Sequence, residues 1–165
     1  MSPLEFFEWL QNTDWSIAIR ESLLLYPLIE TTHVLALCVS VGLIAIVDLR
    51  LIGLSFSNVL ISEVTGKLIP WALVGFTLMV TSGLLLFYAN PLKASQNLFF
   101  QIKMVALLLA GLNAFFFHAA IYRKATTWDS LQILPFRARL AGCASLTLWT
   151  AVLVSGRLQA FNWFN

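Results

Sequence analysis

The chain has 165 residues, of which 59% are hydrophobic and only 11% are charged. A soluble domain is typically about 45–50% apolar and about 25% charged, so this composition excludes a soluble globular protein and predicts an integral membrane protein. The net charge of +2 without a basic run excludes a nucleic-acid partner, and two cysteines without a dense pattern exclude a disulfide framework.

The first predicted element is a short helix at residues 2–11, with the sequence SPLEFFEWLQ. Pro3 directly after Ser2 is a favourable helix start, and Leu4, Phe7 and Leu10 recur at helical spacing. The segment is too short to cross a bilayer, so we expect an interfacial helix that lies on the membrane.

Four apolar runs follow, at residues 23–47, 68–88, 98–122 and 140–160. Each is close to the ~20 residues that a helix needs to cross about 30 Å of hydrocarbon. Helices are also the open-chain structures that satisfy their own backbone groups in lipid. We therefore expect an all-α fold, an integral membrane four-helix bundle that forms a single transmembrane domain over residues 1–165.

The distribution of lysine and arginine predicts the orientation of the bundle. The linkers after the first and third spans, with their flanks, hold Arg50, Lys67, Arg123, Lys124, Arg137 and Arg139. The other side holds Arg20, Lys93, Lys103 and Arg157, together with several acidic residues. The positive-inside rule then places the first group in the cytoplasm and both termini outside, which in a bacterial inner membrane, the expected location, is the periplasmic side.

Polar side chains form a stripe along the first span. At 100° per residue, Glu30, His33, Ser40 and Asp48 fall within about 80° of one another. A charged side chain at the membrane centre costs at least about 2.5 kcal/mol on insertion scales, so such groups normally face protein or a water-filled cavity. We therefore expect the stripe to face the bundle interior.

Ion pairs are the structural explanation for these charges. Glu30 is expected at the same depth as Lys103 on the third span and Arg157 on the fourth, so a buried pair with either is expected. At the other membrane boundary, Asp48 and Arg50 are expected in a second cluster, together with Arg137, Arg139 and His118.

His33 and His118 are the two histidines of the chain, and imidazoles on separate membrane helices are the ligands of b-type haem. Gly111 and Ala114 lie on the face of His118, where small residues would admit a flat macrocycle, although they also suit plain helix packing. The two histidines are expected on the order of 15 Å apart in depth, so both cannot bind one iron at these span boundaries. A structural or proton-handling role is the alternative for each.

A haem bound by His33 and another ligand stays open, and Met104 is expected at a similar depth. Trp149, in the middle of the last span, either fills a cavity or walls a cofactor pocket. We expect a polar cavity beside His33, lined by the first, third and fourth spans.

The residues around His33 also allow two other kinds of metal site to be considered, a di-iron site and a copper site. Glu30 and His33 form one Glu-x-x-His pair, whereas carboxylate-bridged di-iron bundles need two such pairs. A softer copper site would use His33, Cys38, Met79 or Met104, but Cys38 is about 140° from His33 on an ideal helix.

Several segments resemble an uncharacterised bacterial family of small four-helix inner-membrane proteins: YPLIETTHVLAL with VDLRLIG, IPWALVGFTLMVTSGLLLF, FFQIKMVALLLAGLNAFFFH and SLTLWTAVLVSGRLQAF. This resemblance implies the fold but no activity. A looser similarity, based on the histidine in the first span and the tryptophan in the last, extends to copper-resistance-type membrane proteins and small membrane cytochromes b.

The functional hypothesis is a membrane-embedded subunit of a redox-linked, electron-transfer system that binds haem b through His33. It would act with a partner membrane or periplasmic redox protein, or as a homo-oligomer. Because the loops are too short for an extramembrane catalytic domain, we do not expect the chain to be an enzyme on its own. The alternatives are a copper or small-solute transport protein and a cofactor-free structural or anchoring subunit.

Overall fold

The structure is a computed structural model that describes residues 2–56, 58–118, 129 and 134–161. All regular elements in these residues are helices, and four of them are long and apolar enough to cross a membrane. They are α3 (Leu25–Ile52), α4 (Ile61–Ala89), α6 (Leu98–Phe116) and α8 (Phe136–Leu158). The expected all-helical fold with four spans is therefore confirmed.

Three helices extend beyond their predicted boundaries: α3 at its C-terminal end, and α4 and α8 at their N-terminal ends, where α8 begins at Phe136 instead of residue 140. α3 continues through Asp48 and Arg50 to Ile52, and Gly53 ends it in the left-handed conformation, with φ 88°. Glycine adopts this conformation without the steric cost that a side chain would bring. α4 begins at Ile61, where an ion pair of 2.7 Å between Glu63 and Lys67 spans one turn of the helix.

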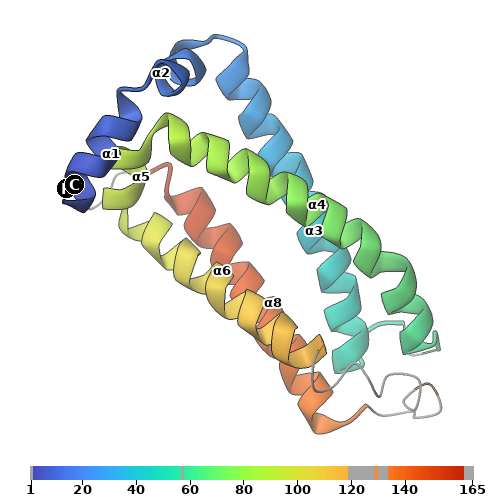
Figure 1. Cartoon of the computed structure of the whole chain (residues 1–165). Coiled ribbons are helices and arrows are strands. Elements are labelled where there is room, and N and C mark those ends of the chain that lie inside the picture. The colour runs from blue at the N-terminus through green and yellow to red at the C-terminus, as the bar shows by residue number, and fades with distance from the viewer. Residues whose placement is uncertain (1, 57, 119–128, 130–133, 162–165) are drawn as a thin grey trace.

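Three short helices lie at one end of the bundle, which we call the terminal end (Figure 1). They are α1 (Pro3–Gln11), α2 (Asp14–Glu21) and α5 (Pro91–Gln96). α1 corresponds to the short helix predicted near the N-terminus, and Ser2 and Glu5 form a capping box at its start. α2 and α5 were not predicted.

α2 is fastened to the end of α4 by hydroxyl groups. The Thr13 hydroxyl lies 2.7 Å from the Tyr88 hydroxyl, and the Ser16 hydroxyl donates to the Tyr88 carbonyl at 3.0 Å. These polar contacts hold α2 against the C-terminal end of α4.

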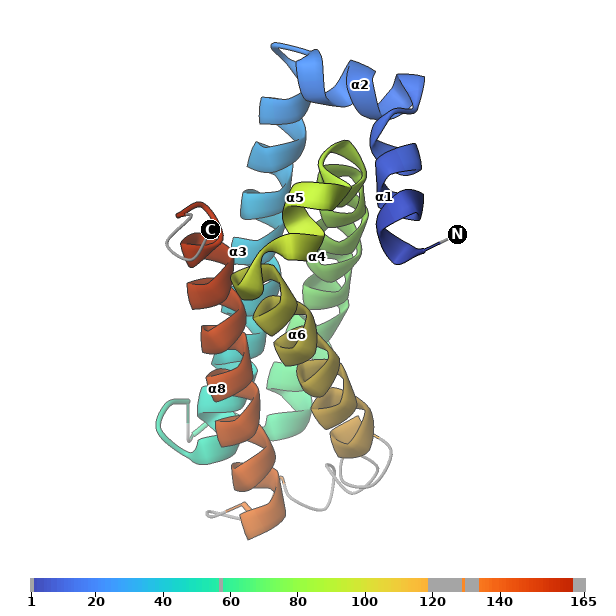
Figure 2. The ribbon, with the colours of Figure 1, turned by 90° about the vertical axis from the view of Figure 1, so that its left-hand side faces the viewer.

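α3 is the central helix of the bundle. It packs along α4 on one side and against α8 on the other, and α6 packs along α8 (Figures 1 and 2). α4 and α6 share no extended contact in the described part of the chain. The bundle is therefore closed on the α3 side and looser between α4 and α6.

Two glycines permit the close approach of helices to α3. A Cβ on Gly75 of α4 would lie 3.1 Å from the Ser40 nitrogen, and one on Gly142 of α8 would lie 3.1 Å from the Asp48 carbonyl oxygen. Small residues at such crossings let two helix backbones pack directly in a membrane. The position of Asp48 is thus fixed by close packing against α8.

Candidate functional site

A cavity of about 440 Å³ lies between the four long helices. It occupies the half of the bundle away from α1 and α2, which we call the opposite end. All four long helices contribute to its wall, which is mostly apolar. The lining residues are Ile44, Val47, Asp48, Leu51, Thr65, Ile69, Ala72, Leu73, Phe76, Leu107, Ala110, Gly111, Asn113, Ala114, Phe117, His118, Ala141, Ser145 and Trp149.

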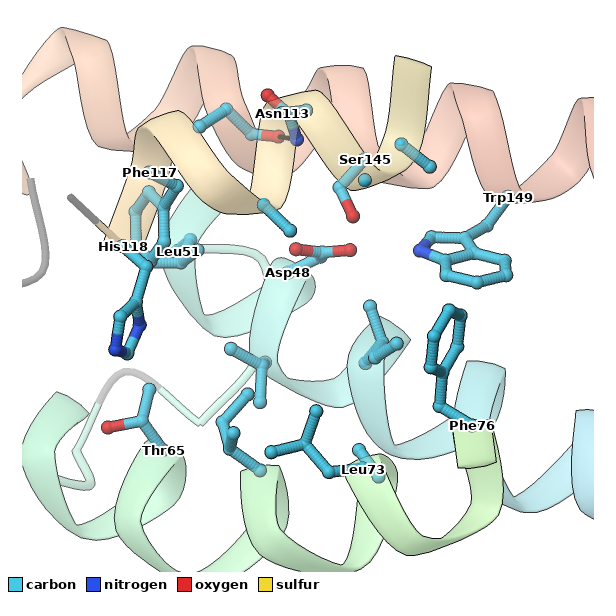
Figure 3. A pocket seen from close by; sticks show the side chains of 18 of the residues that line it. Asp48, Leu51, Thr65, Leu73, Phe76, Asn113, Phe117, His118, Ser145 and Trp149 are labelled. Carbon is cyan, nitrogen blue, oxygen red and sulfur yellow. Dashed lines mark hydrogen bonds between the residues drawn. The ribbon is translucent and has the colours of Figure 1, made fainter. Parts of the chain in front are cut away.

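Asp48 is the acidic group of this cavity. Its side chain is only 5% exposed, and its Oδ2 atom has no hydrogen-bond partner among the residues that the structure describes. The hydroxyl of Ser145 on α8 points toward the carboxylate (Figure 3). Burying a carboxylate without full pairing is costly, so this arrangement needs a compensating role.

Two aromatic side chains stand beside Asp48. Trp149 of α8 is 7% exposed and presents the nitrogen-bearing edge of its indole toward Asp48 (Figure 3). Phe76 of α4 meets Trp149 edge to face, with ring centroids 6.4 Å apart and planes at 86°. The carboxylate and the aromatic pair therefore border the same space.

Two further polar groups line the cavity. The Asn113 amide donates to the Ala141 carbonyl at 3.0 Å and so links α6 to α8. The His118 imidazole, just beyond α6, is turned toward Thr65 and away from Asp48 (Figure 3). Gly111 has no atom within 4 Å of a Cβ built on it, so it contributes open space.

His33 lies outside this cavity, in the other half of the bundle. Its Nδ1 is 2.9 Å from the Met79 carbonyl oxygen and 3.1 Å from the Ser82 hydroxyl, both on α4. A Cβ on Gly83 would come within 3.0 Å of the imidazole ring. The prediction of a cavity beside His33 is therefore corrected. α4 packs directly against the His33 ring, and the cavity lies around Asp48 instead.

The two histidines are far apart, as expected from their depths. His33 contacts Ser82 on α4, whereas His118 lines the cavity with Thr65 near the start of the same helix. Positions 65 and 82 of one helix are about 25 Å apart along its axis at ~1.5 Å per residue. One haem iron cannot be bound by both.

The other predicted site residues divide between the cavity and the surface. Gly111 and Trp149 line the cavity together with Asp48 and His118. Met104 is 49% exposed on α6 and does not line it.

The expected ion pair of Glu30 with Arg157 or Lys103 is not formed in the described residues, where the one ion pair joins Lys67 and Glu63. Glu30 and Arg157 are both exposed, and the Arg157 guanidinium lies 5.7 Å from the centroid of the Phe161 ring. Lys103 is half-buried and passes across Gly156 of α8.

The physical reason is the position of Glu30 in the first turns of α3. Its neighbour Leu28 is 61% exposed, so this part of the helix is not enclosed by the bundle. The inward face of α3 begins at His33 and continues through Ser40 and Asp48, which are both buried. Glu30 therefore does not belong to the interior stripe.

The expected charge cluster at the opposite end is replaced by backbone contacts. Arg50 is buried, and its Nε donates to the Val59 carbonyl at 2.8 Å rather than pairing with Asp48. Asp129 accepts hydrogen bonds from the Ser62 hydroxyl at 2.6 Å and the Ser62 backbone at 3.1 Å. These bonds hold the pKa of Asp129 below its usual value. Arg137 and Arg139 are exposed.

The described residues contain no group of three or more His, Cys, Asp or Glu side chains that could hold a metal ion. Cys38 and Cys143 are both exposed, so neither joins His33 in an interior site. The copper alternative therefore has no such ligand set within the described part of the chain.

Three cavity residues were not anticipated as site residues: Phe76, Asn113 and Ser145. Residue type alone does not mark Ser145 or Phe76, because serines in membrane helices mostly bond their own backbone and phenylalanine occurs 13 times in the chain. A signal was present for Asn113, because an amide in the run LLLAGLNAFFF is costly unless it meets a partner inside the bundle.

A family model described as a family of unknown function (DUF6644) matches residues 6–162. The match includes all four long helices and every residue that lines the cavity. No curated protein and no solved structure matches the chain.

Proposed function

Since the chain belongs to the family of unknown function DUF6644, we propose a function from its cavity: it is a membrane-embedded binding protein for a small lipophilic molecule. The observation that carries this proposal is the cavity of about 440 Å³ between the four spans, with one buried carboxylate in a mostly apolar wall. Small-molecule sites typically have volumes of about 300–1,000 Å³ and an apolar lining with few polar groups.

The bilayer is the proposed route to this cavity. Leu73 of α4 lines the cavity and is also 58% exposed, so the wall is open to the outside at this point. α4 and α6 share no extended contact in the described residues, whereas α3 is packed against both of its neighbours. A lipophilic molecule dissolved in the membrane would therefore reach the site between α4 and α6.

Binding of a neutral fluorescent dye tests this proposal. N-phenyl-1-naphthylamine, added to the protein in lipid nanodiscs, should give saturable fluorescence above that of empty nanodiscs. Gly111→Phe should abolish this signal, because its side chain would fill the cavity. Gly42→Phe is the matched control, since Gly42 is exposed on α3 and also has open space around its Cβ.

Saturable binding that is lost in Gly111→Phe and kept in Gly42→Phe would support the proposal. A parent protein without saturable binding, or binding that Gly111→Phe leaves unchanged, would refute it.

Haem ligation by His33 is the second candidate, and the hydrogen bond to the Met79 carbonyl favours it. A carbonyl oxygen only accepts, so it fixes the proton on Nδ1 and leaves Nε2 as the nitrogen that could bind iron. In this hypothesis the chain is a redox-linked subunit with an electron-transfer partner or a second copy. A Soret band in the purified protein is the expected result.

A further inference from the structure

We propose that the cavity selects lipophilic molecules that carry a positive charge, with Asp48 as the counter-charge and Phe76 and Trp149 as an aromatic wall. This inference rests on the proposed function, because it names the chemical class of the ligand in the same cavity.

The first step is the electrostatic isolation of Asp48. Its Oδ2 has no partner among the described residues, although the side chain is only 5% exposed. The nearest arginine in the sequence, Arg50, donates its Nε proton to the Val59 carbonyl. Among the described residues that line the cavity there is no lysine or arginine. No cationic side chain of the described residues therefore neutralises this carboxylate, so a bound cation or a proton must do so.

The second step is the chemistry of the wall beside Asp48. Trp149 and Phe76 are arranged edge to face, 6.4 Å between centroids, and both border the cavity. The indole edge of Trp149 is turned toward Asp48, so the aromatic pair offers a ligand at this carboxylate a large apolar contact area. A carboxylate next to aromatic rings suits an organic cation, whereas an anion would be repelled by Asp48.

The third step excludes a small metal ion as the occupant. Divalent cations require several oxygen, nitrogen or sulfur ligands. The described residues hold no group of three such acidic, histidine or cysteine side chains. A large cation with dispersed charge needs one carboxylate and an apolar wall, and it can also reach the site through lipid.

A proton competes with this cation for the same carboxylate. Of the described residues that line the cavity, Asp48 and His118 have ionisable side chains, and those on α4 and α8 have none. As pH falls, Asp48 becomes neutral and no longer attracts a cation, so cation binding weakens. The dissociation constant should rise by up to tenfold per pH unit below the titration of Asp48.

Binding of tetraphenylphosphonium to the protein in nanodiscs of zwitterionic lipid tests the inference. The parent should bind this cation saturably and should not bind tetraphenylborate, an anion of similar size and shape. Asp48→Asn should lose the binding and Asp48→Glu should keep it. Trp149→Leu should weaken it at least fivefold. Glu30→Gln is the matched control, because it removes an exposed carboxylate from the same helix.

N-phenyl-1-naphthylamine binding shows whether each variant retains the folded cavity. If Asp48→Asn does not fold, the pH dependence in the parent and in His118→Gln still decides the question, since both should bind less cation as pH falls. Equal binding of the two phenyl ions, binding that survives in Asp48→Asn, or binding that is independent of pH would overturn the charge selectivity. If the charge selectivity fails but the protein still binds the neutral dye, the proposed function stands. If the protein binds neither the neutral dye nor the cation, both proposals are refuted.

Discussion

His33 and Asp48 are two polar side chains of α3 that meet the cost of burial in different ways. His33 is half-buried and hydrogen-bonds the Met79 carbonyl and the Ser82 hydroxyl of α4, so packing between two helices accounts for its position. Asp48 keeps an oxygen without a partner among the described residues. A buried polar group without a partner costs about 1–3 kcal/mol, and a charged group costs more. We infer that Asp48 is retained for binding, whereas His33 also has a structural role.

Replacement of His33 by leucine separates these roles. His33→Leu removes both contacts to α4, and we expect a loss of about 1–3 kcal/mol in the free energy of unfolding. Thr32→Val is the control, because the exposed Thr32 hydroxyl donates within its own helix, to the Leu28 carbonyl at 2.8 Å. Thermal unfolding in one detergent measures both variants, and an absorption spectrum of each follows any Soret band.

Equal stability of His33→Leu and the parent would show that the two hydrogen bonds contribute nothing to the free energy of unfolding. A Soret band that disappears in His33→Leu while the fold remains would support haem ligation. An unchanged band would remove His33 from that hypothesis.

At the scale of single residues, the sequence predicted that the first span carries a polar face but not where that face begins. The periodicity places Glu30, His33, Ser40 and Asp48 on one side of a helix. It does not reveal that α3 extends beyond its neighbours at Glu30, which leaves that carboxylate exposed. It also cannot show which of the buried groups finds a hydrogen-bond partner, because the partners of His33 are 46 and 49 residues away in the chain.

At the scale of helices, the existence and order of the four long helices could be predicted, because apolar runs of about 20 residues are a strong signal of membrane spans. The limits of α3 and α4 could not be predicted, because both helices continue into charged sequence, α3 as far as the cap at Gly53 and α4 from Ile61. The choice of neighbours also escaped prediction. It depends on close contacts such as Gly75 against Ser40, and glycines occur at many other positions in the spans.

Gly75 should therefore be the glycine of α4 that tolerates a side chain least. Gly75→Leu would place its Cβ 3.1 Å from the Ser40 nitrogen and 3.2 Å from the Ala36 oxygen, and backbone atoms of a helix cannot move aside cheaply. We expect a loss of about 1–3 kcal/mol, the usual cost of overpacking. Gly66→Leu, on the same helix with nothing within 4 Å, should lose far less. Similar melting temperatures for the two variants would mean that the α3–α4 crossing is not tightly packed.

At the scale of the whole molecule, the arrangement of the helices determines where a ligand can bind. α3 joins the α4 side to the α8 side, and the cavity lies where all four long helices approach one another toward the opposite end. No pattern within a single span predicts this, because the cavity results from the lack of extended contact between α4 and α6 in the described residues. The membrane side on which Asp48 lies then decides from which compartment its proton would come.

The lysines and arginines predict the orientation of the molecule in the membrane, and cysteine labelling measures it. The rule that positive loops remain in the cytoplasm places Lys67 inside and Lys93 outside. Lys67 is exposed near the start of α4, and Lys93 is exposed in α5, which follows the other end of α4. Each is therefore accessible to a reagent on its own side of the membrane. In a background with Cys38 and Cys143 replaced by alanine, a membrane-impermeant maleimide should label Lys93→Cys in intact cells. Lys67→Cys should react only after the membrane is opened.

The reverse pattern would place the opposite end of the bundle, and Asp48 with it, on the outer side. With the expected pattern, Asp48 lies nearer the cytoplasmic surface, because it is on the last turns of α3, close to the linker that leads to Lys67. A cation that arrives from the lipid would then displace a proton toward the cytoplasm. The test uses proteoliposomes in which the opposite end of the bundle, with Asp48, faces the interior. Acidifying the interior should weaken tetraphenylphosphonium binding more than acidifying the outside does.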